Sequence, residues 1–166
     1  MNTKQSILWQ RLALAGLAAA GFASVTTAAV AGECPANQRV ADGRGQQPGP
    51  TAPQDVTDKI IAMTDLTKEQ LGIKDRLFRA RQLEVKPGGI VPWHSHGDRP
   101  AMIYVVSGEI VEYASTCAVP IEHRAGEVTA ERAPTSHWWQ NTGTVPAVLI
   151  SVDLFRIDDK VNEKMM

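Results

Sequence analysis

Two histidines, His94 and His96, are separated by a single residue in the segment 90-IVPWHSH-96. Side chains two positions apart in a β-strand project from the same face, so both imidazoles would lie on one side of a strand. A third histidine, His137, lies in a later segment of strand character, 137-HWWQN-141. Imidazole nitrogens bind transition metals, so the three residues predict a metal site wherever the fold brings these strands together.

The elements that position these histidines are predicted to be short strands. Segments rich in β-forming residues alternate with turn signals such as 86-KPGG-89, 97-GDRP-100 and 142-TGTVP-146. The expected strands cover residues 56–63, 75–85, 90–96, 101–106, 109–113, 121–124, 127–130, 137–141 and 147–155. Short strands with turn signals about every eight to twelve residues are typical of an all-β sandwich or barrel.

The first 31 residues predict a secretory signal peptide. They carry Lys4 and Arg11, then an uncharged Ala-rich stretch that ends in the small-residue pattern 29-AVA-31. The alternative is an uncleaved transmembrane anchor, because the stretch is long enough to span a bilayer. Its polar second half and its cleavage-like end favour removal near Ala31. This predicts a periplasmic or secreted protein with no stable membrane anchor.

Four segments follow: the signal peptide 1–31, a Gly/Pro-rich N-terminal arm 32–55, one β-domain 56–157 and a polar tail 158–166. Cleavage would remove two of the 17 basic residues and none of the 18 acidic ones, leaving a net charge of about −3 (15 − 18). A net negative charge of this size does not favour binding to nucleic acid, which is itself negatively charged. Cys34 and Cys117 are the two cysteines, and an even pair in an exported protein predicts a disulfide.

Around the histidine pair the sequence resembles the cupin family of small double-sheet barrels. The first cupin motif is a glycine, five residues, His-x-His, three or four residues, a glutamate, six residues and a glycine. Gly88, the two histidines and Gly108 fit this spacing. The glutamate does not, because its position is occupied by Ala101, or by Pro100 with the shorter spacing.

The second cupin motif is partly present. Gly126, His137 and Asn141 fit its start and end, whereas Arg132 and Pro134 replace its proline and glycine. The resemblance covers roughly residues 76–156. It implies a double-stranded β-helix (jelly-roll) barrel, preceded here by the extended arm. It also implies one divalent transition metal (Fe, Mn, Cu, Ni or Zn) held by the three histidines. A small-molecule ligand is expected as well, and the resemblance is compatible with a homodimer.

The replaced glutamate leaves three alternatives. The site has three histidines and no carboxylate, or another acid replaces the glutamate, or the histidines bind substrate without a metal. Two acids are candidates for a fourth ligand or an acid/base group. Asp98 lies two residues after His96, and Glu131 lies in the turn expected before His137.

Four residues are predicted to line the substrate pocket. Trp139 shares the strand parity of His137, Ile103 and Val105 provide apolar wall, and Arg99 lies in the turn near the pocket mouth. Arg79 and Arg81 share one strand face, which we expect to be solvated, with anion binding as the alternative. His123 is expected at the surface.

The resemblance implies an oxygenase-like reaction on a small organic substrate. A Lewis-acid isomerase or lyase is one alternative. A non-catalytic periplasmic module that senses or carries a small ligand or a metal is another. The sequence contains no nucleophile elbow, phosphate-binding loop or dinucleotide fingerprint.

Overall fold

The computed structural model describes residues 32–157, and almost all of its regular structure is β-strand. The strands are β1 (Gln54–Asp65), β2 (Arg76–Ser95), β3 (Ala101–Ser107), β4 (Glu109–Ala114), β5 (Ile121–Arg124), β6 (Val128–Glu131), β7 (Ser136–Gln140) and β8 (Ala147–Arg156). Two short 3-10 turns, η1 (Ala36–Gln38) and η2 (Leu66–Lys68), complete the list. The predicted signal peptide and polar tail lie outside the described residues. Within 32–157, no helix is long and apolar enough to cross a membrane.

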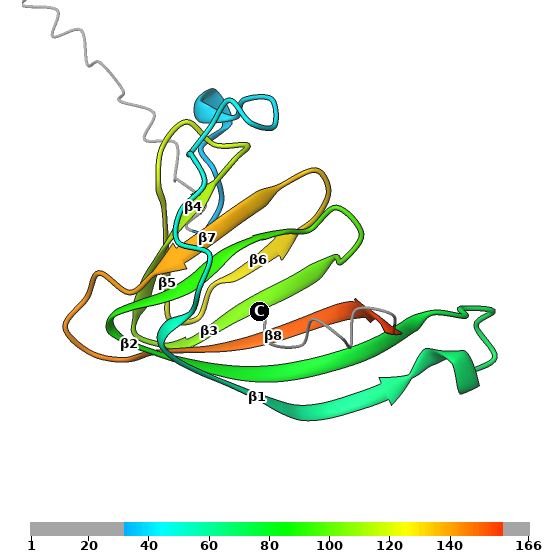
Figure 1. The fold of residues 1–166 in the computed structure, drawn as a ribbon. Coiled ribbons are helices and arrows are strands. Elements are labelled where there is room, and N and C mark those ends of the chain that lie inside the picture. The colour runs from blue at the N-terminus through cyan, green and yellow to red at the C-terminus, as the bar shows by residue number, and fades with distance from the viewer. Residues whose placement is uncertain (1–31, 158–166) are drawn as a thin grey trace, which may run out of the picture.

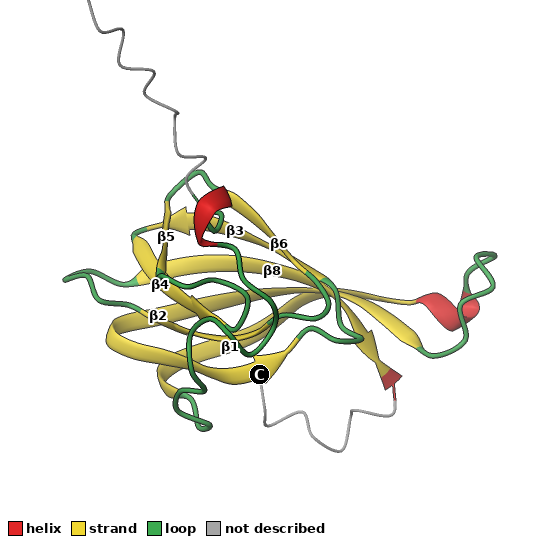
Figure 2. Ribbon diagram, turned by 90° about the horizontal axis from the view of Figure 1, so that it is seen from above, coloured by secondary structure: helices red, strands yellow, loops and turns green. Residues whose placement is uncertain are grey.

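The strands form one antiparallel sheet that curls into an open barrel (Figures 1 and 2). Their order is β5-β4-β7-β2-β8-β3-β6. Strand β1 pairs with β2 between Leu77 and Ile90. The predicted all-β jelly-roll fold is therefore confirmed. In β3 to β8 alternate residues face the interior, as the period of a β-strand requires, whereas β1 is exposed along most of its length and β2 alternates on either side of an irregular segment.

The interior of the barrel is divided into an apolar and a polar part. The apolar core contains Leu83, Val85, Val91, Ile103, Val105, Ile110, Trp139, Ala147 and Leu149. Buried polar side chains occupy neighbouring inward positions on the same strands, among them Arg79, Arg81, Glu112, Glu131, His137, Ser151 and Asp153. A polar group that is removed from water needs a partner, so this part of the barrel is where a functional site is expected.

Strand β2 differs from expectation because it is continuous. The sequence predicts two strands separated by a turn at 86-KPGG-89, whereas one strand runs through this segment. A register shift lies further on: Val91 pairs with Trp139, but His94 pairs with His137. The extra residue is a β-bulge at Pro92–Trp93, and a bulge reverses which parity faces inward. As a result, His94 and His96 point into the barrel, as Leu83 and Val85 do.

The N-terminal arm is attached to the strands by covalent and hydrogen bonds. Cys34 and Cys117 form the predicted disulfide, with a sequence separation of 83. The backbone N–H of Val40 donates to Thr116 at 2.9 Å, and that of Trp93 in the bulge donates to Pro50 at 2.8 Å. In Figure 1 the arm passes beside β4 and β7 before it enters β1.

Candidate metal centre

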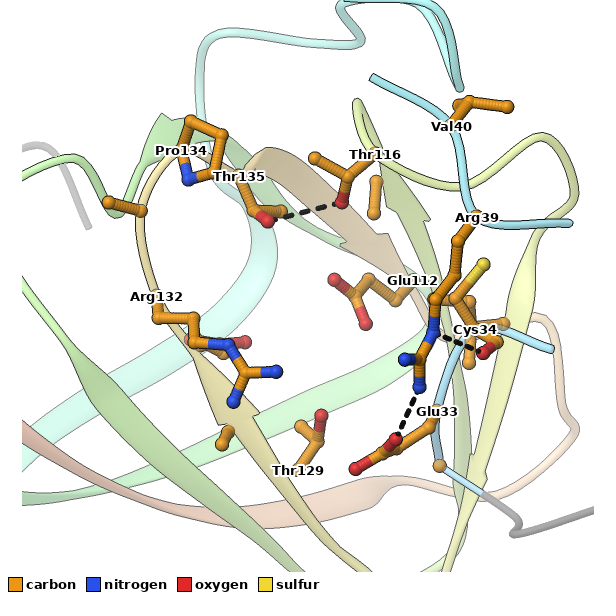
Figure 3. A pocket seen from close by; sticks show the side chains of 16 residues that line it. Glu33, Cys34, Arg39, Val40, Glu112, Thr116, Thr129, Arg132, Pro134 and Thr135 are labelled. Atoms are coloured by element: carbon orange, nitrogen blue, oxygen red, sulfur yellow. Dashed lines mark hydrogen bonds and ion pairs between the residues drawn. The ribbon is translucent and has the colours of Figure 1, made fainter. Parts of the chain in front are cut away.

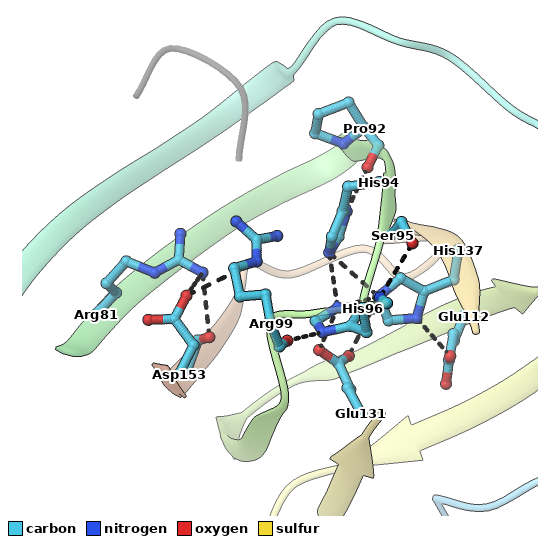
Figure 4. A network of polar contacts seen from close by, with 12 residues as sticks. Arg81, Pro92, His94, Ser95, His96, Arg99, Glu112, Glu131, His137 and Asp153 are labelled. Carbon is cyan, nitrogen blue, oxygen red and sulfur yellow. Dashed lines mark hydrogen bonds and ion pairs between the residues drawn. The ribbon is translucent and has the colours of Figure 1, made fainter. Parts of the chain in front are cut away.

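The three predicted histidines converge on one point. The Nε2 atom of His96 lies 3.1 Å from that of His94 and 3.0 Å from that of His137, and the remaining pair is 3.2 Å apart. His94 and His96 extend from the end of β2, and His137 lies on the neighbouring strand β7, directly paired with His94. His137 is fully buried and His96 nearly so. Figure 4 shows the three rings facing one another.

Hydrogen bonds to the opposite ring nitrogens orient the histidines. His94 Nδ1 donates to the carbonyl of Pro92 at 2.8 Å, and His96 Nδ1 donates to the carbonyl of Arg99 at 2.7 Å. His137 Nδ1 donates to Glu112 Oε1 at 2.6 Å. Since these acceptors place a proton on each Nδ1, the neutral rings present lone pairs at Nε2. Three lone pairs at about 3 Å from one another repel unless a proton or a metal ion lies between them.

The spacing of these nitrogens fits a single metal ion. Ligand atoms 3.0–3.2 Å apart subtend roughly 90–100° at an ion about 2.1 Å from each of them. A regular tetrahedral ion would separate them by about 3.4 Å. The observed spacings are close to both values, so the three nitrogens could hold one ion of either geometry and leave further positions open.

Glu131 brings the missing carboxylate to this centre. Its Oε2 atom lies 3.0 Å from His96 Nε2, and Oε1 lies 3.5 Å from His137 Nε2. Ligand atoms of the four residues all lie within 4.8 Å of one another. Glu131 ends strand β6, where it pairs directly with Ala101 on β3. The acid thus comes from the residue opposite the position at which the first cupin motif has its glutamate.

Asp98, the other acid considered, lies elsewhere. Its carboxylate is half exposed and pairs with Arg156 at 3.3 Å and with Arg76 at 4.0 Å. The turn after His96 directs it outward, away from the four-residue cluster. Within residues 32–157, the ion pairs of Asp98 are with these two arginines, and it does not belong to the four-residue cluster.

Glu112 is a buried carboxylate that connects two histidines. Besides His137 Nδ1, it accepts a hydrogen bond from His123 Nε2 at 2.9 Å. Burial alone would raise the pKa of Glu112, but the charges and hydrogen bonds of His137 and His123 outweigh burial and lower its pKa to about 2. His123 is only 1% exposed and stacks on Trp139, so the expectation of a surface histidine is wrong. Its inward position on β5 explains the difference.

The pKa values of His94 and His137 shift in opposite directions, and each shift has a physical cause. Burial, with the charges of His137 and His96, holds the pKa of His94 well below its usual range. Burial also opposes a charge on His137, but Glu131 and Glu112 outweigh it and raise its pKa. The same pair of carboxylates would attract a divalent cation, which binds only deprotonated imidazole.

A small cavity of about 30 Å³ borders the histidines inside the barrel. Its lining residues are Arg81, Leu83, Val91, His94, His96, Ile103, Glu131, Trp139, Leu149 and Ser151. Two of the predicted pocket residues, Ile103 and Trp139, belong to this wall. Val105 is 1% exposed and lies in the apolar core behind it. Arg99 does not line this cavity; its carbonyl accepts the hydrogen bond from His96, and its Nε lies 4.0 Å from Asp153.

A cluster of arginines adjoins the cavity. Arg79 donates to both carboxylate oxygens of Asp153, at 3.0 and 2.8 Å. Arg81 pairs with Asp58 and donates to Ser151 Oγ at 3.2 Å. Both arginines are buried, so the expectation of a solvated strand face is wrong, because Asp153 provides a buried counter-charge. Burial, together with Arg81, lowers the pKa of the Arg99 guanidinium.

A second cavity, of about 270 Å³, lies between the N-terminal arm and strands β4, β5 and β6 (Figure 3). Glu112 and Glu131 line it, and Arg39 and Arg132 lie at its rim in Figure 3. Glu131 borders both cavities. Its carboxylate therefore separates the barrel interior from the space beneath the arm.

Three residues of the site were not anticipated, although each leaves a signal in the sequence. Glu112 is an acid at an inward position of the alternating segment 109-EIVEYA-114. Ser151 and Asp153 are polar residues within the apolar strand 147-AVLISVDLFR-156, at the parity of Leu149. A charged residue that falls on the buried face of a strand predicts a buried partner.

Comparisons with known proteins agree with this architecture. Residues 81–153 match the family described as Cupin domain. Nectarin-1 from Nicotiana langsdorffii x Nicotiana sanderae is 34% identical over 73 residues, which are 42% of this chain and 32% of Nectarin-1. The chain thus spans about a third of that relative's length.

Two solved structures are similar in backbone. The cupin domain of Schizosaccharomyces pombe Cnp3 aligns with a TM-score of 0.49 and 14% identity, over 66% of this chain and 72% of that one. KdgF from Halomonas sp. aligns with a TM-score of 0.48 and 18% identity, over 63% and 83%. The family match, the motif glycines and the histidine positions together support the cupin assignment for residues 81–153, the part of the chain that the family match covers.

Proposed function

We propose that the protein binds one divalent transition metal through His94, His96, His137 and Glu131, and acts as an oxidoreductase on a small organic substrate. The observation that carries this proposal is the convergence of three Nε2 lone pairs at 3.0–3.2 Å, each fixed by a hydrogen bond at Nδ1. A redox-active metal held there would supply electron transfer between an organic substrate and dioxygen.

The residues that surround the cavity support an oxidoreductase because most of them are apolar and exclude water. Leu83, Val91, Ile103 and Leu149 surround it with aliphatic carbon, and Trp139 closes one side. Such walls exclude water and strengthen electrostatic interactions inside. Glu112 holds His137 in the ligand tautomer, and Glu131 adds one negative charge toward the cation.

One observation favours a second candidate, an isomerase or lyase that uses the metal as a Lewis acid. Glu131 Oε1 is buried and has no hydrogen-bond partner among residues 32–157. A carboxylate oxygen with a free lone pair beside the cavity is placed to accept a proton from a substrate. The two candidates differ in whether dioxygen is consumed.

We also propose that the protein is exported. The Cys34–Cys117 disulfide supports an oxidising compartment, because disulfides persist in the periplasm and outside the cell. The predicted signal peptide, residues 1–31, agrees with this proposal.

Elemental analysis of the purified protein tests the metal centre. We expect about one transition metal per chain, retained through desalting and absent from the His94→Ala/His96→Ala variant, with circular dichroism verifying that the variant is folded. Protein that takes up no metal even after incubation with Fe(II), Mn(II), Ni(II) and Zn(II) would overturn the proposal.

Oxygen uptake then separates the candidates. We expect the Fe(II)- or Mn(II)-loaded protein to consume dioxygen with at least one of the probes glycolate, pyruvate and catechol. Conversion of a probe without oxygen uptake would favour the Lewis-acid reaction. Metal and probe binding with no conversion would identify a binding module instead.

A further inference from the structure

Three guanidinium groups surround a single buried carboxylate next to the candidate metal centre. Asp153, which is 1% exposed, accepts two hydrogen bonds from Arg79. Arg81 Nη2 lies 3.6 Å from the same carboxylate, and Arg99 Nε lies 4.0 Å from it. Figure 4 shows Arg81 and Arg99 on either side of Asp153, with Arg99 toward the histidines.

The charges of this cluster do not balance. Asp58 provides a second carboxylate through its ion pair with Arg81. Within the cluster two carboxylates face three guanidinium groups. Glu131 also acts on Arg99 from the wall of the neighbouring cavity, so one positive charge is in excess when Glu131 is engaged by a cation. An excess charge beside a low-dielectric cavity is costly, so the cluster then favours an additional anion.

Arg99 is the group that lacks its own counter-ion. Arg79 has a bidentate carboxylate partner, and both Nη atoms of Arg81 are engaged by Asp58 or Ser151. The Arg99 guanidinium, although its side chain is only 11% exposed, makes no hydrogen bond to any of residues 32–157. Arg81 Nε is also buried and has no partner in that part of the chain. Free donors are therefore available on two adjacent arginines.

One arginine of the cluster, Arg81, lines the same cavity as the proposed metal ligands, whereas Arg79 and Arg99 lie outside its wall. Arg81 and Ser151 line it together with His94, His96 and Glu131. The carbonyl of Arg99 accepts the hydrogen bond from His96 Nδ1, so the backbone that orients a ligand also carries the free guanidinium. An anion bound by Arg99 would lie beside the metal centre.

We propose that Arg99, together with Arg81, binds a carboxylate of the substrate, so that the substrate class is small organic acids. The planar guanidinium matches a carboxylate through two parallel hydrogen bonds. The excess of one positive charge matches a monoanion better than the charge of about −2 carried by a phosphate monoester. The cavity of about 30 Å³ admits only one small end of such a molecule. This inference deepens the proposed metal-dependent function and rests on it for the position of the reacting end.

The test compares two probes of nearly equal shape and different charge. Oxamate carries one carboxylate, and oxamide replaces it with a neutral amide. Titration calorimetry on the anaerobic Mn(II)-loaded protein is expected to show tighter binding of oxamate. The Arg99→Gln variant is expected to reduce this preference by about 10- to 100-fold, the loss typical of a charge-assisted hydrogen bond. Arg124→Gln, which removes an exposed arginine on β5, is the matched control and should leave the preference unchanged.

The outcomes distinguish this site from the metal site. Equal binding of the two probes, or an unchanged preference in Arg99→Gln, would overturn the carboxylate site while Mn(II) retention still supports the metal centre. If the protein does not retain Mn(II) but the metal-free form still prefers oxamate through Arg99, the carboxylate site stands and the metal proposal fails. Should Arg99→Gln not fold, Arg99→Lys keeps the charge but not the planar fork, and is expected to lose part of the preference.

Discussion

Glu131 is the residue whose role is easiest to separate from that of its neighbours. Its carboxylate lies 3.0 Å from His96 Nε2, whereas Asp98, which is much closer to His96 in sequence, pairs with Arg76 and Arg156. We predict that Glu131→Gln weakens metal binding on the order of 100-fold, at the upper end of the loss caused by residues that only support a ligand. Asp98→Asn should leave affinity unchanged. Competition with a chelator measures both, and equal effects of the two substitutions would contradict the assignment.

Glu112 is a positioning residue, because it acts on the metal only through His137. A glutamine at this position keeps one acceptor oxygen but turns an amide N–H₂ toward a second histidine donor, so one of the two hydrogen bonds is lost. We predict that Glu112→Gln reduces metal affinity by about 10- to 100-fold. Glu122→Gln, an exposed carboxylate on β5, is the control. A loss of thermal stability without a change in metal affinity would argue against the positioning role.

At the scale of elements, the bulge in β2 decides which side chains enter the barrel. Leu83 and Val85 face inward at odd positions, whereas His94 and His96 do so at even positions. A regular strand would have directed Trp93 inward and the histidines outward. Proline at position 92 removes a donor from the ladder, and the free N–H of Trp93 bonds to the arm instead. The site therefore depends on an irregularity that a proline in the strand segment signals.

The pairing of β3 with β6 explains how Glu131 on β6 could replace the motif glutamate expected at position 101 on β3. Ala101 and Glu131 are direct partners, so their side chains leave the sheet on the same face, about 5 Å apart. We predict that Glu131→Ala loses the metal and that adding Ala101→Glu in the same chain restores much of the affinity. The single Ala101→Glu variant is the comparison, because it places a second carboxylate between Glu131 and Asp153 and should lower stability. Failure of the double variant to regain metal, although folded, would contradict the cross-strand replacement.

These two elements also show what the sequence could and could not predict. The alternation of short strands and turns predicts the all-β class, and the cupin resemblance implies the barrel and the three-histidine set, because the motif glycines and histidines keep their spacing. Gly108 illustrates the reason: at φ of +77° it approaches the carbonyl of Pro146 so closely that a Cβ would lie 2.7 Å away. The choice of Glu131 over Asp98, and the burial of Arg79 and Arg81, depend on cross-strand register and on Asp153. Register between distant strands is not encoded in a single segment.

For the whole molecule, the N-terminal arm and the barrel together enclose space that neither encloses alone. Gly32, Cys34 and Val40 of the arm line the 270 Å³ cavity, opposite Glu112 and Glu131. The arm is held there by the disulfide and by backbone hydrogen bonds to the segment after β4. The four proposed metal ligands, in contrast, lie on or directly after β2, β6 and β7, which are strands of the sheet.

The arm is held by the disulfide, whereas the proposed metal ligands lie outside the arm. Removal of the disulfide should therefore affect stability and metal binding differently. The Cys34→Ser/Cys117→Ser variant should lose up to about 4 kcal/mol of unfolding free energy, since the bond closes a loop of 83 residues. Hydrogen exchange should increase at Val40 and Gly45, whose N–H groups bond to the segment after β4. Metal content should stay at the wild-type level below the melting temperature, because no ligand belongs to the arm. Wild-type protein treated with a reductant should behave in the same way. Loss of the metal together with the arm would mean that the enclosed cavity, and not the sheet alone, maintains the centre.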